Sequence, residues 1–356
     1  MPSLEQALAL SNSSDPGSVS TLARRNRLTR FLSTLPLSSS FHRFLRDNFF
    51  AVVCDTFVYM GAPLLLLSQG LAGLSFLSLV PLLSRIKIRV PYAPSRTVDL
   101  FLARDFASRV PPTSSHKSRL ILFVHGGAWG SGSPSMYRPL ALGLLRRGFD
   151  VGLVGYRVYP AGDVDGQCED VSKAVAAVES WSRSNSVSWS SVTLAGHSSG
   201  ANISLVSLLR SPSPFVTKLA LLSGVHDLAV HSDYEAMRGL EELSPLKSAA
   251  GFSRDAMFAG GARGGLGGLR PGFPEVFFYH GIADDVVPFL QSAQAMKALG
   301  GAGARVGGLF EEGADHIAPL MDIMFGTRQG KAARALESFC VSEAAPELFV
   351  APGSRL

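Results

Sequence analysis

The residues Gly-His-Ser-Ser-Gly at 196–200 match the pattern Gly-x-Ser-x-Gly around Ser198. A serine in this pattern can act as a nucleophile when it lies on a sharp turn between a strand and a helix. The pattern decides little alone, because the chain of 356 residues contains 36 glycines. A serine hydroxyl is a weak nucleophile, so this chemistry also requires a histidine base and an acid that orients the base.

Asp284 and His316 are the predicted partners of Ser198. Each follows an apolar run, in FFYHGIADD and GLFEEGADH, and therefore falls at a strand end, where open α/β sheets place their sites. They follow the serine in the required order, acid first and histidine second. His226 and His231 lie between the serine and the acid and are out of order.

Two further histidines, His125 and His280, each precede a glycine at a strand end, and we interpret both as structural. Asp285 and Asp315 are interpreted as loop carboxylates. His197, beside the nucleophile, points off the turn and is interpreted as a wall of the site or a packing residue rather than a second base.

A glycine-rich loop, HGGAW at 125–129, is the candidate oxyanion hole. Acyl transfer passes through a tetrahedral intermediate whose negative oxygen needs fixed N–H donors. Gly126 and Gly127 lack side chains, so their amides can approach a substrate, and Ser199 supplies a third amide. Trp129 and Tyr156 either line a substrate pocket or fill the core, and His197 is a third pocket candidate.

The elements that must position these residues alternate between short apolar strands and helices. Apolar runs predict strands, and VTLAG before Ser198 with SSGANISLVSLLR after it predict a strand and a buried helix. The predicted strands are 97–105, 119–127, 150–158, 191–196, 216–224, 275–281 and 305–310. The predicted helices are 135–148, 170–181, 198–210 and 330–340. This alternation predicts an α/β fold with a mostly parallel central sheet and helices on both faces.

Composition limits the function. The net charge is +5, but residues 1–96 carry +6 and the other 260 residues sum to −1. The main body therefore lacks the basic face of a nucleic-acid-binding protein. Three cysteines, Cys54, Cys168 and Cys340, are too few and too scattered for a metal site or a disulfide framework, so we expect no metal and no cofactor.

The chain divides into four predicted parts. Residues 1–48 form a basic, Ser- and Arg-rich tail predicted to be disordered, and 346–356 form a second tail. Residues 49–84 are predicted to be a hydrophobic helical region that spans a membrane or associates with one, since 56–83 hold no charge and about 20 apolar residues span a bilayer. Residues 85–345 are the catalytic domain, with a cap or loop insertion at 225–272.

The motifs HGGAW, GYRVYP, GHSSGA, HGIADDVVP and EGADH, in this order, resemble the α/β-hydrolases of the carboxylesterase and hormone-sensitive-lipase-like group. The GGAW loop and the LSG…SP stretch are most similar to isoprenylcysteine methylesterases, whereas GHS is closer to kynurenine formamidases. The resemblance implies the α/β-hydrolase fold, a serine hydrolase activity and, by the spacing HGxxD, Asp284 rather than Asp285 as the acid.

Three hypotheses follow. The first is a carboxylesterase acting through an acyl-enzyme on Ser198, on a lipophilic substrate such as a prenylcysteine methyl ester, at the endoplasmic reticulum or another endomembrane. An organelle-targeted or cytoplasmic enzyme is the alternative location. The second is an arylformamidase using the same residues. The third is a catalytically silent hydrolase fold that serves as a membrane-tethered binding protein. No protein partner is predicted.

Overall fold

The computed structural model describes residues 79, 81–107, 119–241, 244–251, 261, 267, 269–342 and 348–350. In this part of the chain a nine-stranded sheet has the order β1-β2-β4-β3-β5-β6-β7-β8-β9. Among the described residues, β3 and the strands β4 to β9 are parallel to one another, and the β1–β2 and β2–β4 pairings are antiparallel. The strands are β1 Ile88–Ala93, β2 Arg96–Phe101, β3 Arg119–Val124, β4 Asp150–Val154, β5 Ser191–His197, β6 Lys218–Leu222, β7 Glu275–Gly281, β8 Val306–Glu311 and β9 Leu348–Val350.

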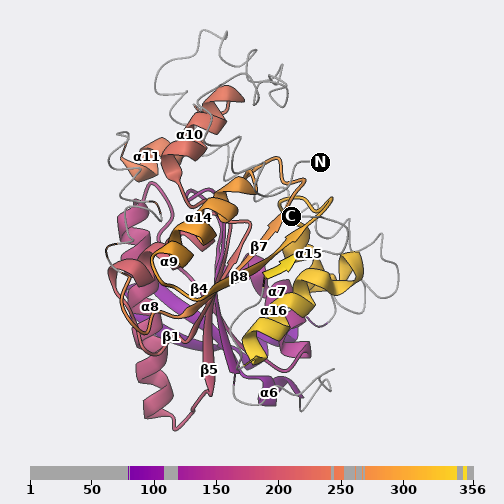
Figure 1. Cartoon of the computed structure of the whole chain (residues 1–356). Helices are drawn as coiled ribbons and strands as arrows, with labels where there is room; N and C mark the ends of the chain where they lie inside the picture. Colours follow the sequence, from indigo (N-terminus) through magenta and orange to yellow (C-terminus); the bar gives the residue numbers. More distant parts are fainter. Residues whose placement is uncertain are drawn as a thin grey trace.

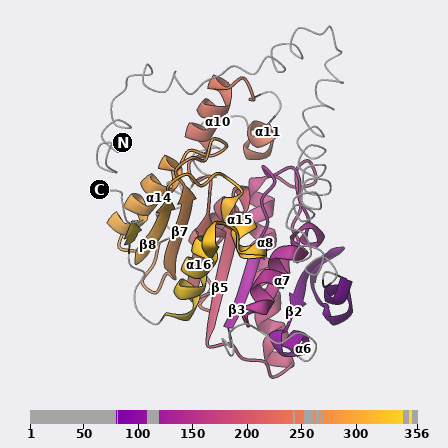
Figure 2. The same cartoon turned by 90° about the vertical axis from the view of Figure 1, so that its right-hand side faces the viewer.

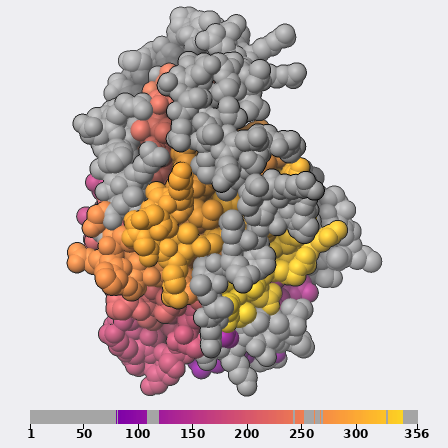
Figure 3. Space-filling view, viewed as in Figure 1, coloured from indigo at the N-terminus to yellow at the C-terminus, as the bar shows by residue number. Residues whose placement is uncertain are grey.

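Helices cover both faces of the sheet, and Figure 1 shows the two groups on opposite sides. One face carries α8 Val164–Ser184, α9 Ser199–Arg210 and α14 Leu290–Gly301. The other carries α7 Arg138–Arg146, α15 Ala318–Phe325 and α16 Lys331–Val341. The outer surfaces of α14 (orange) and α16 (yellow) are visible on the face drawn in Figure 3. The remaining elements are α6 Ala103–Ala107, η3 Pro134–Tyr137, α10 Leu228–Met237, α11 Leu246–Ala250 and η5 Thr327–Gly330.

The run LILFV in β3 shows why the central strands are apolar without interruption. Successive side chains of a strand point to opposite faces of the sheet. Leu120, Leu122 and Val124 therefore enter the core beneath α8 and α9, whereas Ile121 and Phe123 enter the core beneath α7 and α16. Both faces are buried, so both sets must be apolar. The predicted parallel sheet with helices on both faces is confirmed.

Several element boundaries differ from the prediction. The strand predicted over 97–105 ends at Phe101, and Ala103–Ala107 form the helix α6. A carboxylate oxygen of Asp150, from β4, accepts the N–H of Ala103 at 2.6 Å where α6 begins. This contact joins residues 47 positions apart, so a local apolar pattern cannot reveal it. Strands β1 and β9 and helices α10, α14 and α15 were not predicted as elements.

The predicted membrane segment 49–84 lies outside the described residues except for its last few positions. Residues 81–86 are helical, and Leu83 is buried in the core beneath α7, where Leu79, Leu82 and Ile86 also pack. Among the described residues, no helix is both long enough and apolar enough to cross a membrane. The membrane role of 49–84 therefore stays a prediction, as does the disorder of the two tails.

Candidate active site

Ser198 lies on the turn between β5 and α9, as predicted. Its φ of 56° and ψ of −124° are a strained conformation for a residue with a side chain, and such strain costs on the order of 1–3 kcal/mol. The turn is held by its N–H, which donates to the carbonyl of Leu222 in β6 at 2.9 Å. Ser198 is partly exposed. Its neighbours His197 and Ser199 are both buried, so the serine is the residue that the turn presents.

The two glycines of the motif are required by close packing. A Cβ at Gly196 would lie 2.3 Å from the carbonyl oxygen of Gly200, and a Cβ at Gly200 would lie 2.3 Å from the carbonyl oxygen of Val124. Both distances are far below van der Waals contact. Only glycine allows α9 to begin this close to β3 and β5.

Asp284 and His316 meet at the carboxyl ends of β7 and β8. Nδ1 of His316 lies 2.8 Å from Oδ2 of Asp284. The other carboxylate oxygen, Oδ1, accepts the backbone N–H groups of Val286 at 3.0 Å and Val287 at 2.8 Å. The Asp284 side chain is fully buried, and that of His316 is 12% exposed. The carboxylate is thus fixed at both oxygens, and the ring of His316 retains access to the surface.

Burial alone would raise the pKa of Asp284. Hydrogen bonds from His280 and His316 outweigh that effect and hold the pKa of this carboxyl below its ordinary range. Asp284 is therefore ionised at neutral pH, although it is buried. An ionised carboxylate accepts the Nδ1–H of His316, which leaves Nε2 as the basic nitrogen of that ring.

The loop at 125–129 lies directly against the serine. A Cβ at Gly126 would lie 2.8 Å from the carbonyl oxygen of His197 and 3.0 Å from the Cβ of Ser198. Gly127, Ala128 and Trp129 all have positive φ, at 131°, 50° and 61°. Three such residues in succession turn the backbone sharply beside the nucleophile.

Amides at this loop and at the start of α9 are available as donors. Among the described residues, no backbone or side-chain acceptor pairs with the N–H groups of Gly126, Gly127 or Ser199. In the same part of the chain the N–H of Ala128 is likewise unpaired, a fourth candidate that the sequence reasoning did not include. Unpaired N–H groups beside a partly exposed serine can stabilise an anionic oxygen.

Comparison with known proteins agrees with the fold described above. Residues 121–257 match the family described as alpha/beta hydrolase fold. The carboxyl esterase 2 structure from Tuber melanosporum aligns with a TM-score of 0.58 and 21% identity, over 73% of this chain and 85% of that one. The fold is the α/β-hydrolase fold.

Two curated relatives carry different names. A kynurenine formamidase of Danio rerio is 30% identical over 174 residues, which is 46% of this chain and 55% of that protein. A probable isoprenylcysteine alpha-carbonyl methylesterase of Oryza sativa subsp. japonica is 26% identical over 242 residues, 63% of this chain and 54% of that protein. The chain thus matches about half the length of these relatives.

In this α/β-hydrolase fold the buried side chain of His197 packs against His316 rather than facing an open pocket. Its Nε2 lies 2.9 Å from the carbonyl oxygen of His316, and the two rings are 4.8 Å apart between centroids. A carbonyl only accepts, so Nε2 of His197 carries the hydrogen. Burial lowers the pKa of His197 to about 3, so the ring is neutral at pH 7. This agrees with the interpretation of His197 as a packing residue.

The structure buries the other two pocket candidates. Trp129 is 1% exposed and Tyr156 is 7% exposed, and both belong to the core beneath α8 and α9. Tyr156 donates its hydroxyl hydrogen to the carbonyl of His125 at 2.7 Å and stacks on the His125 ring at 4.2 Å. Of the two roles considered for these residues, the structure supports core packing, with Tyr156 supporting the glycine loop.

Helices α10 and α11 lie beyond the carboxyl end of the sheet in both cartoon views (Figures 1 and 2). The hydroxyl of Tyr234 in α10 donates to the carbonyl of Asp285 at 2.7 Å, beside the acid. Pro245, which precedes α11, packs against Gly130 of the glycine loop, where an added Cβ would lie 2.9 Å from its Cγ. The insertion predicted at 225–272 thus contacts Asp285, next to the acid, and Gly130, next to the glycine loop.

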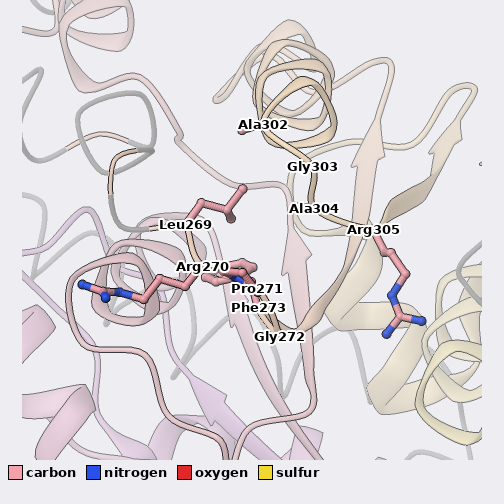
Figure 4. Close-up of a pocket in the computed structure, with 9 residues that line it drawn as sticks. All are labelled: Leu269, Arg270, Pro271, Gly272, Phe273, Ala302, Gly303, Ala304 and Arg305. Carbon is pink, nitrogen blue, oxygen red and sulfur yellow. The ribbon is translucent and has the colours of Figure 1, made fainter.

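A cavity of about 340 Å³ lies elsewhere, at the amino ends of β7 and β8. Figure 4 shows the guanidinium groups of Arg270 and Arg305 pointing away from Pro271 and Gly272 in opposite directions. Arg305 instead pairs with Glu275 at 2.8 Å. The lining is Leu269, Arg270, Pro271, Gly272, Phe273, Ala302, Gly303, Ala304 and Arg305, and it includes none of the predicted site residues.

One contact of the acid was missed from the sequence. Nε2 of His280 lies 3.1 Å from Oδ2 of Asp284. The spacing of four residues between a strand-end histidine and the acid was the available signal.

Among the described residues, no group of three or more His, Cys, Asp or Glu side chains could hold a metal ion.

Proposed function

We propose that the protein is a serine hydrolase that cleaves carboxylic esters. The observation that carries the proposal is the Asp284–His316 hydrogen bond of 2.8 Å, at the same edge of the sheet where a strained turn presents Ser198. A nucleophile, an ionised carboxylate and a histidine, in this chain order, are what acyl transfer requires in such a fold. The same edge carries unpaired backbone N–H groups.

In the proposed mechanism Ser198 Oγ attacks the ester carbonyl, and Nε2 of His316 takes the hydroxyl proton. Asp284 keeps the hydrogen of His316 on Nδ1 and stabilises the imidazolium that forms. The tetrahedral intermediate collapses to an acyl-enzyme, and the alcohol leaves with the proton from His316. Water then attacks the acyl-enzyme with His316 as base, which releases the acid and restores Ser198.

The oxyanion is held by the backbone N–H groups of Gly126, Gly127 and Ser199. These donors are fixed before substrate arrives, because the backbone of Gly126 packs closely against the turn and Gly127 has a positive φ. Preorganised donors of this kind lower the barrier because they do not have to reorient during the reaction.

A second candidate function is arylformamidase activity. It is favoured by the 30% identity to the fish kynurenine formamidase over 174 residues. The machinery is the same, except that Ser198 attacks a formamide carbonyl and His316 protonates a leaving amine. The two functions therefore differ in the substrate that fits the site, not in the catalytic residues.

The proposal is tested by comparing wild type with Ser198→Ala on three substrates: p-nitrophenyl acetate, a prenylcysteine methyl ester and N-formylkynurenine. We expect Ser198→Ala to lose a factor of about 10⁴ or more in kcat. Ser207→Ala, at a buried serine further along α9 whose hydroxyl donates to the Ser204 carbonyl, is the matched control and keeps its activity. A folded wild type inactive on all three substrates, or a Ser198→Ala variant as active as wild type, contradicts the proposal.

The relative kcat/KM for the three substrates decides between the two functions. A preference for either ester supports the esterase, and a preference for N-formylkynurenine supports the formamidase. A preference for the prenylcysteine ester also supports a lipophilic substrate.

We further propose that residues 49–84 place the enzyme at a membrane, where a lipophilic ester is available. The supporting observation is that the uncharged run within this segment, residues 56–83, ends on the hydrolase body, where Leu83 is buried. Carbonate extraction of membranes tests the point. Retention of the full chain, with release of a chain beginning at Arg85, supports anchoring, and full release of the intact chain rules out spanning.

A further inference from the structure

His280 occupies the end of β7, four residues before Asp284, and is completely buried. Its ring makes three polar contacts. Nε2 lies 2.9 Å from the carbonyl oxygen of Val287 and 3.1 Å from Oδ2 of Asp284, and Nδ1 lies 2.7 Å from Oγ of Ser292 in α14. A buried histidine with both nitrogens engaged has one defined orientation.

These partners determine which nitrogen carries the hydrogen. The Val287 carbonyl can only accept, and so can the ionised carboxylate of Asp284, so Nε2 of His280 must donate. The hydroxyl of Ser292 then donates to Nδ1. The result is a ring in one orientation, with the N–H of Nε2 directed toward the acid.

The same carboxylate oxygen is shared by two histidines. Oδ2 of Asp284 lies 2.8 Å from Nδ1 of His316 and 3.1 Å from Nε2 of His280. The opposite oxygen is bound by the backbone of Val286 and Val287. Asp284 therefore has four donors in a buried site, and of these four only His280 and His316 are side chains.

We propose that His280 is a positioning residue, which fixes the plane of the Asp284 carboxylate and supplies the second side-chain hydrogen bond to the oxygen that orients His316. The proposal deepens the proposed function and rests on it, because it requires His316 to act as the base. In this arrangement Ser292 acts one step further out, since its hydroxyl lies 2.7 Å from Nδ1 and holds the orientation of the His280 ring.

Loss of the His280 donor has a defined sign. Oδ2 would keep its negative charge in a buried position with one donor fewer, so the pKa of Asp284 rises and the pairing with a protonated His316 becomes stronger. The active form needs an ionised Asp284 and a neutral His316. Both changes therefore move the acidic limb of the kcat/KM profile to higher pH.

The test compares His280→Leu with His280→Gln. Both side chains are smaller than the ring, but the Gln amide can still donate where Nε2 did. Kinetics on p-nitrophenyl acetate, per site titrated with a fluorophosphonate, should show kcat lowered about 10- to 100-fold in His280→Leu, as expected for losing a hydrogen bond to a charged group. KM should be unchanged, the acidic limb should move up, and His280→Gln should recover most of both.

A residue that only fills the core would behave differently. Both variants would then lose thermal stability and titratable sites, while the sites that remain would keep the wild-type kcat and pH profile. That result overturns the proposal, as does an equal loss in the Leu and Gln variants.

The variant Ser292→Ala keeps His280 and tests its positioning role if His280→Leu does not fold. Without the hydroxyl, Nδ1 of His280 loses its hydrogen-bond partner, so the ring is held less firmly against the Asp284 carboxylate. We expect a smaller loss of kcat with the same upward shift of the acidic limb, and a wild-type profile would overturn the proposal.

A second readout does not require turnover. The downfield proton resonance of His316 Nδ1–H in Ser198→Ala protein should shift when His280→Leu is added, because the accepting oxygen has changed. An unmoved resonance would overturn the proposal. Failure of the proposed function is recognised separately, since wild type would then be neither labelled by the fluorophosphonate nor active.

Discussion

The two ends of the parallel sheet differ in what they offer a small molecule. The amino end of β7 and β8 has a cavity of about 340 Å³. Its two arginines point away from Pro271 and Gly272 (Figure 4). The carboxyl end has Ser198 on a strained turn and a buried carboxylate shared by His280 and His316.

The cavity at the amino end therefore does not identify the candidate site, since its lining includes none of the predicted site residues. What distinguishes the carboxyl end is that several strand ends and the glycine loop bring a serine, a histidine and a buried carboxylate to the same edge of the sheet. Such groups are costly to bury unless their partners are in position. Charged groups at the amino end pair with one another, as Arg305 does with Glu275 at 2.8 Å, and the cavity there is bounded mainly by a loop and by the turn after α14.

The largest effect should come from Asp284→Asn, which removes the acceptor that keeps hydrogen on Nδ1 of His316. We expect kcat to fall by a factor of about 10⁴, as when a triad carboxylate becomes an amide. Asp285→Asn, at the exposed neighbouring position, is the control and should stay near wild type in steady-state kinetics. If the two variants lose activity equally, Asp284 is not the orienting acid.

Gly126→Ala should have the next largest effect, because its Cβ would lie 2.8 Å from the His197 carbonyl oxygen and push the loop away from Ser198. Displacing one oxyanion donor corresponds to a loss of about 10²- to 10³-fold in kcat. Gly301→Ala, where an added Cβ meets nothing within 4 Å, is the matched control. Steady-state kinetics on p-nitrophenyl acetate would contradict the assignment if both variants matched wild type.

Acid stability should also depend on the carboxyl end. Burial lowers the pKa of His226 to about 3, whereas the unfolded value is about 6.5. The unfolded state therefore binds a proton between these values and the folded state does not, so stability is lost as the pH falls below about 6.5. His226 is 1% exposed, and its ring nitrogens have no partner among the described residues.

Urea unfolding of wild type and His226→Phe checks this. We expect the two proteins to have similar free energies of unfolding at about pH 7.5. Between about pH 6 and pH 5, the free energy of unfolding should fall less steeply in the variant than in wild type, by about 1.4 kcal/mol per pH unit. The burial and lowered pKa values of His125 and His197, about 4 and about 3, leave a residual slope in the variant. Parallel pH profiles for the two proteins would show that His226 is not buried in its neutral form.

The smallest effect should come from the amino-end cavity. Arg270→Ala removes an exposed side chain that points away from Pro271 and Gly272. We expect kcat/KM to change by less than about twofold, since exposed substitutions of this kind alter free energies by about 0.5 kcal/mol or less. A tenfold or larger loss of kcat/KM would show that the cavity takes part in substrate binding, which would contradict the distinction drawn between the two ends of the sheet.

Much of the site arrangement could be predicted from the sequence because its signals are local. Gly196 and Gly200 flank the serine, and Asp284 and His316 each follow an apolar strand, so strand ends brought them to one edge. The contact between Asp284 and His316 follows from that placement. The mostly parallel sheet was predictable for the same reason, since continuous apolar runs indicate strands buried on both faces.

The remaining features depend on contacts between distant residues. His197 reaches the carbonyl of His316, 119 positions away, and Asp150 caps the backbone at Ala103. Trp129 was left between pocket and core because its burial depends on how α8 packs. His280 was interpreted as structural because it precedes a glycine at a strand end, and its contact with Ser292 in α14 has no signature in the strand that carries it.

The most direct test of the central claim is labelling of the full-length protein with a fluorophosphonate, followed by intact-mass measurement and peptide mapping. We predict one adduct per chain, located on Ser198, and no adduct on the Ser198→Ala variant. An unlabelled but correctly folded wild type, or equal labelling of the Ser198→Ala variant, would contradict the claim that the carboxyl end of the sheet is the active site of a serine hydrolase.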